Sequence, residues 1–167
     1  MLEELNPYLD MAVSVIHRHE GIVDKFIGDA VFAFWGIAPG KSDPIEQAFA
    51  CARALLQTAS KMSFGGTPLI LGIGLNAGRV FSGNVGSEEK RQFTVLGHPV
   101  NMAARYEGVT KELHASIVLG EEFAHRLPPT LFALLQKHER VAIKGASIQT
   151  VYTYCLNSTP DKNGEGQ

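Results

Sequence analysis

Hydrophobic residues recur at helical spacing in the first part of the chain. From residue 2 to residue 18, apolar side chains return every three or four positions with acidic residues between them, which predicts an amphipathic helix. Two short runs rich in β-branched and aromatic residues follow at 22–27 and 30–35, and only Gly28 and Asp29 separate them. This spacing predicts two strands joined by a tight turn.

The rest of the chain alternates between helical and strand-like patterns. Pro44 stands in the first turn of a second amphipathic helix predicted at 44–62, and Gly83 and Gly86 are placed for tight turns. Mixed strands and helices with several hairpins predict an α+β fold, in which helices cover one face of a mixed sheet. The remaining predicted elements are helices at 99–107, 121–126 and 130–137, and strands at 69–76, 79–82, 93–96, 116–119, 140–143 and 150–155.

Length and composition indicate one domain. The chain has 167 residues, 45% hydrophobic and 19% charged, so we expect a single core within 1–156 and a disordered tail at the polar segment 157–167. A net charge of −2 offers no basic surface for nucleic acid or anionic membrane. No apolar stretch approaches the roughly 20 residues of a membrane-spanning helix, so we expect a cytoplasmic protein. The two cysteines, Cys51 and Cys155, are expected to be buried, reduced thiols.

The predicted hairpin carries two candidate functional residues. Asp29, a carboxylate at a strand turn, is a candidate cation ligand, but it could equally be an ordinary turn aspartate that caps its own backbone. Lys25 lies four residues earlier and would share a face with Asp29 along a continuous strand, since side chains alternate with period two. Taken alone, Lys25 could also be a solvated lysine.

Three further residues suit phosphate chemistry. Asn101 and Arg105 are about one helical turn apart, so an amide and a guanidinium can converge on one phosphate-bearing ligand. The alternative is that both are ordinary polar surface residues near the start of a helix. Lys144, followed by Gly145, could present an ammonium to a polyphosphate or form a hairpin turn.

Several segments together resemble the catalytic domain of class III adenylate and guanylate cyclases. They are 21–29 (GIVDKFIGD), 72–78 (GIGLNAG) with 83–86 (GNVG) after it, and 100–105 (VNMAAR), and the resemblance runs from about residue 6 to residue 154. It implies a ferredoxin-like α+β domain that dimerises head to tail, with nucleotide sites built at the interface from both chains.

The resemblance also implies a role for the hairpin residues. Asp29 would be one of two aspartates that hold two divalent ions, Mg²⁺ or Mn²⁺. Lys25 and Thr94 match the purine-selecting positions, where lysine with threonine or aspartate goes with adenine, and glutamate with cysteine goes with guanine. ATP is therefore the expected substrate.

For the remaining candidates, the resemblance implies contacts with the ribose and the phosphates. Asn101 would orient the ribose, Arg105 would stabilise charge that develops on the phosphorus, and Lys144 would bind the terminal phosphates. The implied reaction is an in-line attack of the ribose 3′-oxygen on the α-phosphate, which yields 3′,5′-cyclic AMP and releases pyrophosphate.

Two departures from the family pattern affect this expectation. The family domain begins with an apolar strand whose aspartate supplies the other metal ligand, whereas this chain starts inside the following helix and holds no match to that aspartate. His98-Pro99 stands where Asp-Thr is common.

Two functions follow as alternatives. The first is a homodimeric adenylate cyclase, in an arrangement that allows an upstream sensor domain, and the joint presence of Lys25, Asp29, Asn101 and Arg105 favours it. The second is a noncatalytic cyclase-like module that binds a nucleotide or regulates a partner, and the missing aspartate favours that reading.

Overall fold

The computed structural model describes residues 2–37 and 42–156, so the tail expected at 157–167 lies outside the described residues. Helix α1 spans Leu2–Arg18, as predicted. Strands β1 (Ile22–Ile27) and β2 (Ala30–Phe34) pair antiparallel, with Ile27 opposite Ala30. The tight turn at Gly28 and Asp29 is therefore confirmed, and Gly28 adopts a φ of 64° that glycine accepts without strain.

The main sheet has four strands in the order β5-β8-β10-β9. Strand β5 (Ile73–Leu75) runs parallel to β8 (Ile117–Gly120), and β10 (Ile148–Tyr154) runs antiparallel to both β8 and β9 (Gln136–Ala142). Together with the helices, this mixed sheet confirms the predicted α+β class. Strands β1 and β2 form a separate two-stranded sheet.

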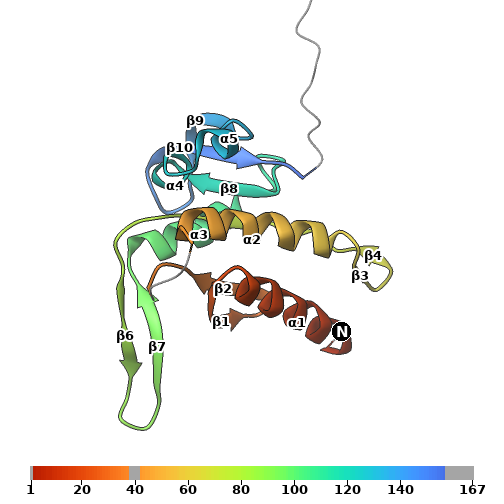
Figure 1. Ribbon diagram of the computed structural model, residues 1–167, viewed down its shortest axis with the longest axis vertical. Coiled ribbons are helices and arrows are strands. Elements are labelled where there is room, and N and C mark those ends of the chain that lie inside the picture. Colours follow the sequence, from red (N-terminus) through yellow and green to blue (C-terminus); the bar gives the residue numbers. More distant parts are fainter. Residues whose placement is uncertain (1, 38–41, 157–167) are drawn as a thin grey trace, which may run out of the picture.

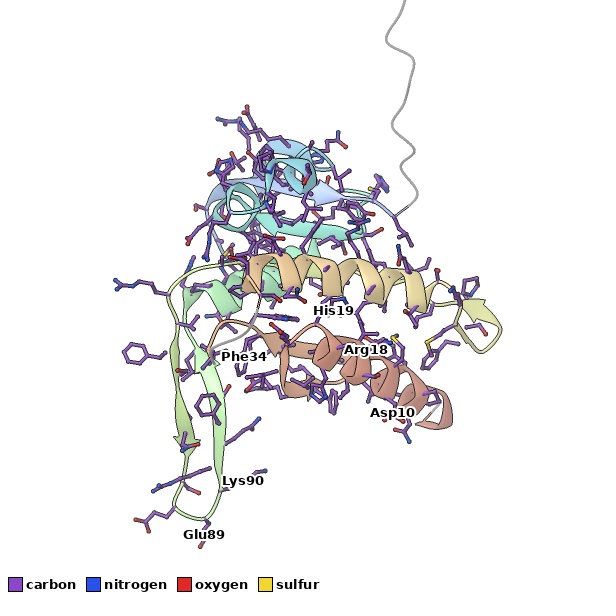
Figure 2. The ribbon with its side chains drawn as sticks, viewed as in Figure 1. Asp10, Arg18, His19, Phe34, Glu89 and Lys90 are labelled. Carbon is purple, nitrogen blue, oxygen red and sulfur yellow. The ribbon has the colours of Figure 1, made fainter. Side chains whose placement is uncertain are left out.

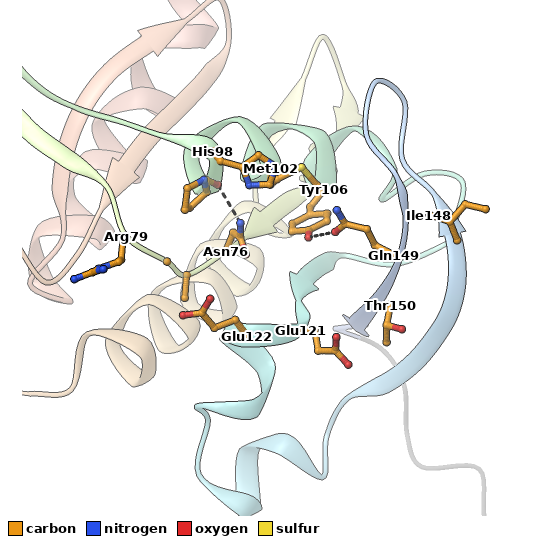
Figure 3. A pocket seen from close by; sticks show the side chains of 13 residues that line it. Asn76, Arg79, His98, Met102, Tyr106, Glu121, Glu122, Ile148, Gln149 and Thr150 are labelled. Atoms are coloured by element: carbon orange, nitrogen blue, oxygen red, sulfur yellow. Dashed lines mark hydrogen bonds between the residues drawn. The ribbon is translucent and has the colours of Figure 1, made fainter.

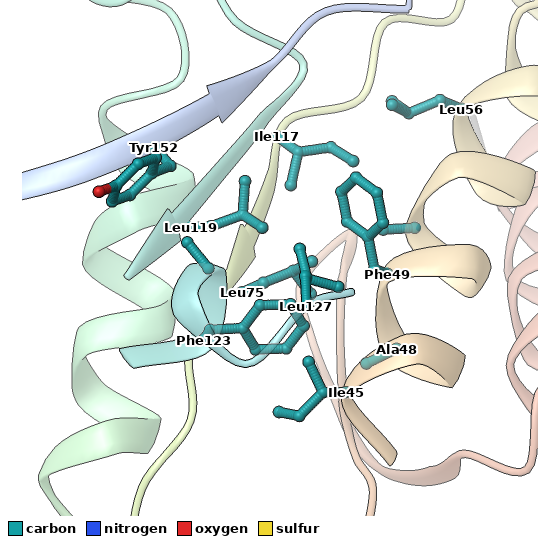
Figure 4. Close-up of a cluster of buried hydrophobic side chains, with 12 residues drawn as sticks. Ile45, Ala48, Phe49, Leu56, Leu75, Ile117, Leu119, Phe123, Leu127 and Tyr152 are labelled. Atoms are coloured by element: carbon teal, nitrogen blue, oxygen red, sulfur yellow. The ribbon is translucent and has the colours of Figure 1, made fainter. Parts of the chain in front are cut away.

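Helices pack on the main sheet through alternate residues of β8. Ile117 and Leu119 face α2 (Pro44–Ala59) in the largest hydrophobic cluster (Figure 4). Val118 faces the other way, toward α3 (His98–Gly108), so the sheet carries α3 on its second face as well. Strand β8 is buried throughout, which explains its uninterrupted apolar sequence.

Several boundaries differ from those predicted. Helix α2 ends at Ala59, and a small hairpin of β3 (Ser63–Phe64) and β4 (Thr67–Pro68) follows it. The helix predicted at 130–137 is wrong in its second half. Helix α4 spans Glu121–His125, and α5 spans only Pro129–Phe132. Lys137 instead lies in β9, where it pairs with Tyr152 of β10, because pairing between the two strands overrides the local helical pattern.

A long hairpin extends away from the rest of the molecule (Figure 1). It consists of β6 (Phe81–Gly86) and β7 (Arg91–Leu96), with Glu89 and Lys90 at its tip (Figure 2). The tight turns expected at Gly83 and Gly86 are wrong, because both residues lie within β6 and pair with β7. In the part of the chain that the structure covers, no helix is long and apolar enough to cross a membrane.

Candidate functional site

A β-bulge in β1 places the side chain of Asp24 inside the protein. Val23 pairs with Ala33 and Lys25 pairs with Phe32, so Asp24 is the extra residue on its strand. A bulge of this kind changes the direction in which a side chain points. The side chain of Asp24 is fully buried, whereas that of Lys25 is 39% exposed.

The carboxylate of Asp24 joins two residues that the sequence singled out. The Thr94 hydroxyl donates a hydrogen bond of 2.9 Å to Oδ2 of Asp24, although the two residues are 70 positions apart. The Lys25 ammonium lies 3.1 Å from the same oxygen. The backbone oxygen of Asp24 also accepts a 2.9 Å hydrogen bond from Gln92 Nε2. Lys25 of β1 and Thr94 of β7 therefore meet at one point.

The other oxygen of this carboxylate is unsatisfied. Oδ1 of Asp24 is buried and has no hydrogen-bond partner among the described residues. Buried polar atoms without a partner are rare in folded proteins, and each one calls for an explanation. Thr94 is itself only 5% exposed. The hydrogen bond between its hydroxyl and the Asp24 carboxylate is therefore almost completely shielded from water.

Helix α3 carries the predicted phosphate-binding pair. Asn101 is exposed in the first turns of the helix, and Arg105 is half-buried one turn later. Arg105 Nη1 lies 3.9 Å from Sδ of Met102. Its Nη2 atom lies 3.4 Å from the position that a Cβ would take at Gly145, so the guanidinium rests against the turn that holds exposed Lys144. The fold thus brings Arg105 to the Lys144 turn.

Asp29 stands apart from the other five candidates. It is exposed in the β1–β2 turn, and within residues 2–37 and 42–156 no hydrogen bond or ion pair joins it to any of them. Burial raises the pKa of the Tyr8 phenol, and the negative charge of Asp29 raises it further, so Asp29 lies near Tyr8 of α1.

A lone exposed carboxylate fits part of a divalent metal site. Mg²⁺ commonly takes one or two carboxylates and completes its shell with waters and substrate phosphates, and Asp29 meets that requirement as one ligand. No group of three or more potential ligands that could hold a metal ion occurs among the residues described. Asp29 alone does not make a complete site.

A hollow of about 600 Å³ lies elsewhere, between α3, the start of α4 and β10 (Figure 3). Tyr106 donates a 2.6 Å hydrogen bond to Oε1 of Gln149 at its wall, and Asn76 Nδ2 donates to the Pro99 carbonyl at 3.2 Å. None of the six predicted residues lines this hollow. It is therefore distinct from the candidate site.

Sequence reasoning placed Asp24 inside the matched segment but assigned it no role. The available signal was a single acidic residue within an apolar strand, directly before a candidate lysine. Burial of that acid depends on the bulge and on the approach of β7, and neither follows from alternation along one strand.

Comparison with known proteins shows the family to which this chain is similar. The family model for the adenylate and guanylate cyclase catalytic domain matches residues 1–158. An uncharacterized protein of Mycobacterium tuberculosis is 34% identical over 142 residues, which cover 84% of this chain and 26% of that protein. This chain thus spans about a quarter or less of the length of the curated relatives it matches.

Solved structures of cyclases share the fold. A bacterial light-regulated adenylyl cyclase superposes with a TM-score of 0.74 at 26% identity, covering 90% of this chain and 43% of the other. The guanylate cyclase domain of a Catenaria anguillulae protein, solved in complex with GTP, gives a TM-score of 0.77 at 21% identity over 91% of this chain and 81% of the other. The neighbours include enzymes named for either purine, so the choice of base depends on this chain's own residues.

Proposed function

Because the chain belongs to the adenylate and guanylate cyclase catalytic domain family, we propose that it acts in the conversion of ATP into 3′,5′-cyclic AMP and pyrophosphate. One observation carries the choice of ATP. Lys25 and Thr94, the two residues matched to purine selection from distant parts of the sequence, converge on the single carboxylate of Asp24. This contact places an ammonium donor beside a buried hydroxyl, the two groups that the proposed purine-selecting roles require.

The chemistry of these two side chains suits adenine. The reading edge of adenine offers a ring nitrogen that accepts a hydrogen bond and an exocyclic amino group that donates one. The Lys25 ammonium can only donate, which matches the ring nitrogen, and the Thr94 oxygen has lone pairs that can accept from the amino group.

Arg105 and Lys144 would handle the phosphates. The guanidinium of Arg105 lies against the turn that contains Lys144, so the two cations can act on one polyphosphate chain. A planar guanidinium can contact two oxygens on the α-phosphate at which charge develops, while a lysine ammonium acts as a point charge on the terminal phosphates. Asn101, one turn before Arg105, would hold the ribose so that its 3′-oxygen faces the phosphorus.

Asp29 would hold the divalent metal on which cyclase domains depend. When bound, Mg²⁺ or Mn²⁺ would lower the pKa of the ribose 3′-hydroxyl and neutralise charge on the triphosphate. Asp29 would contribute an exposed anionic oxygen from the two-residue turn between β1 and β2.

We further propose that two copies of the domain assemble the site. No hydrogen bond or ion pair joins Asp29 to the other five candidates within the described residues of one chain, which is expected if a second copy brings it to them. The β6–β7 hairpin supports this proposal because it projects from the body and exposes large apolar side chains, which mark interaction surfaces. Its most exposed member is Phe81, at 86%.

A noncatalytic cyclase-like module is the second candidate function. The observation that favours it is that Asp29 is the one metal-binding aspartate matched among the described residues, whereas the family pattern has two. Such a module would still bind a nucleotide through Lys25, Thr94 and Arg105.

The test is cyclic AMP formation from ATP in the presence of Mn²⁺. This chain should be compared with a version extended upstream through an apolar strand that ends in the second aspartate. Activity confined to the extended chain is the expected result. A lack of activity in both chains, with nucleotide binding retained, would favour the regulatory module.

A further inference from the structure

Asp24 occupies an unusual position relative to the two base-selecting residues. It belongs to neither the matched purine positions nor the phosphate and metal positions, yet it contacts both Lys25 and Thr94 through one oxygen. Its side chain is fully buried, and its second oxygen has no partner among the residues described. A buried carboxylate that only tied two strands together would be expected to have both oxygens satisfied.

The hydrogen bond to Asp24 fixes the direction of the Thr94 hydroxyl. A threonine hydroxyl has one proton and can otherwise act as donor or acceptor, whereas a carboxylate can only accept. Because Thr94 donates its proton to Oδ2 of Asp24, the lone pairs of the hydroxyl oxygen are all that remains for a ligand. In this arrangement Thr94 is an acceptor only.

The same carboxylate holds the Lys25 ammonium, which is a donor only, at 3.1 Å. The pair therefore offers one donor and one acceptor in a fixed order. Adenine presents the complementary order, an accepting ring nitrogen and a donating amino group. Guanine presents the reverse, a ring N–H and a carbonyl oxygen, so it would place donor against donor and acceptor against acceptor.

We propose that Asp24 is a positioning residue that makes the site selective for adenine, by committing the Thr94 proton and orienting the Lys25 ammonium. This inference rests on the proposed adenylate cyclase function and extends it to a residue that does not touch the base. Loss of the carboxylate frees the Thr94 hydroxyl to rotate and donate to the guanine carbonyl. Selectivity should then fall even though Lys25 and Thr94 are both still present.

The experiment compares kcat/KM for ATP and GTP in the chain form that produces cyclic AMP. Asp24→Asn should lower the ATP-to-GTP ratio by about tenfold or more, the effect of one misdirected hydrogen bond. Asp10→Asn, which removes the same charge from an exposed position on α1, is the matched control and should leave the ratio unchanged.

Two substitutions at Thr94 test the same hydrogen bond from its other end. Thr94→Val removes the hydroxyl and should lower the ratio, whereas Thr94→Ser keeps the hydroxyl and should retain it. Because both substitutions break the same hydrogen bond, the double variant Asp24→Asn, Thr94→Val should lower the ratio by less than the product of the two single effects.

A measurement on the unaltered protein covers the case in which Asp24→Asn fails to fold. The Thr94 hydroxyl proton should exchange slowly with water in an NMR spectrum, because it is donated to a buried carboxylate. Rapid exchange of this proton would overturn the inference.

The outcomes separate the inference from the proposed function. Equal losses of ATP and GTP turnover in Asp24→Asn, with an unchanged ratio, would show a merely structural carboxylate and overturn the inference alone. If no form of the chain produces cyclic AMP, the proposed function fails and the inference fails with it.

Discussion

Individual side chains of the site differ in how closely the fold holds them. Asp24 is fixed by a bulge and by a hydrogen bond from Thr94, whereas Asn101, Lys144 and Asp29 are exposed. Arg105 is intermediate, resting against the turn at Gly145. The proposed base-reading residues are therefore preformed in one chain, and the residues proposed to act on the phosphates, ribose and metal are more open.

Replacement of Arg105 should affect the chemical step more than binding. Arg105→Lys keeps the charge but loses the planar fork, so kcat for cyclic AMP formation should fall by about 100-fold with a small change in KM. Arg126→Lys, the same change at an exposed position outside the site, should have no effect. Equal effects of the two substitutions on kcat would contradict the role proposed for Arg105.

The two cysteines should react differently with thiol reagents. Cys51 is completely buried, and burial raises the pKa of its thiol to about 12, so the reactive thiolate is scarce at pH 8. Cys155 was expected to be buried but is half-exposed. Titration with Ellman's reagent should show one fast thiol in the native protein and two after denaturation, and Cys155→Ser should abolish the fast phase. Equally fast reaction of both thiols would show that Cys51 is accessible.

Elements whose signals are local were predictable from the sequence, and those fixed by pairing were not. The Gly28-Asp29 turn and helix α1 agree with their predictions because glycine placement and helical periodicity act over a few residues. Strand β9 was partly read as helix because its pairing with β10 is a tertiary effect. The six candidate residues could be located in the sequence, but the contact between Asp24 and Thr94 depends on elements 70 residues apart.

Helix α3 lies so close to strand β5 that one glycine controls their spacing. A Cβ at Gly74 would overlap the Ala103 carbonyl oxygen and come within 2.5 Å of the Glu107 amide nitrogen, both in the backbone of α3. Gly74→Ala should therefore lower the free energy of unfolding by about 1–3 kcal/mol, measured by urea denaturation, and displace Asn101 and Arg105 enough to reduce activity.

Gly83 supplies the matched control for this substitution. It also lies in a strand, but a Cβ there would have nothing within 4 Å. Gly83→Ala should change the free energy of unfolding by no more than about 0.5 kcal/mol. Similar losses for both variants would mean that the approach of α3 to β5 is not what requires glycine at position 74.

The whole molecule combines a compact body with one projecting hairpin. The body is stabilised by clusters on both faces of the main sheet, whereas β6 and β7 leave Phe81, Val85, Phe93 and Leu96 between 47% and 86% exposed. Apolar side chains of this size on a projecting arm indicate contact with another protein surface. We have proposed that this surface is a second copy of the domain.

Substitution of Phe81 should weaken association without unfolding the domain. Phe81→Ser removes a ring that is 86% exposed, so the melting temperature of the isolated chain should stay within a degree or two while the dimer dissociation constant rises at least tenfold. Ile70→Ser, at a side chain that is 89% exposed outside the hairpin, controls for loss of surface hydrophobicity. Sedimentation velocity over a concentration series provides the measurement. Unchanged association in Phe81→Ser would exclude this part of the hairpin from the interface.

Mixing two inactive variants of the catalytically competent chain tests directly whether two copies share each site. Asp29→Asn removes the proposed metal ligand, and Arg105→Ala removes the proposed phosphate contact, so each variant alone should form almost no cyclic AMP. Suppose that each site takes Asp29 from one copy and Arg105 from the other. In an equimolar mixture, half of the dimers then combine the two variants, and each mixed dimer has one intact site and one doubly altered site. About a quarter of the unaltered activity should therefore return. A mixture that remains as inactive as its components would contradict a site shared between two copies.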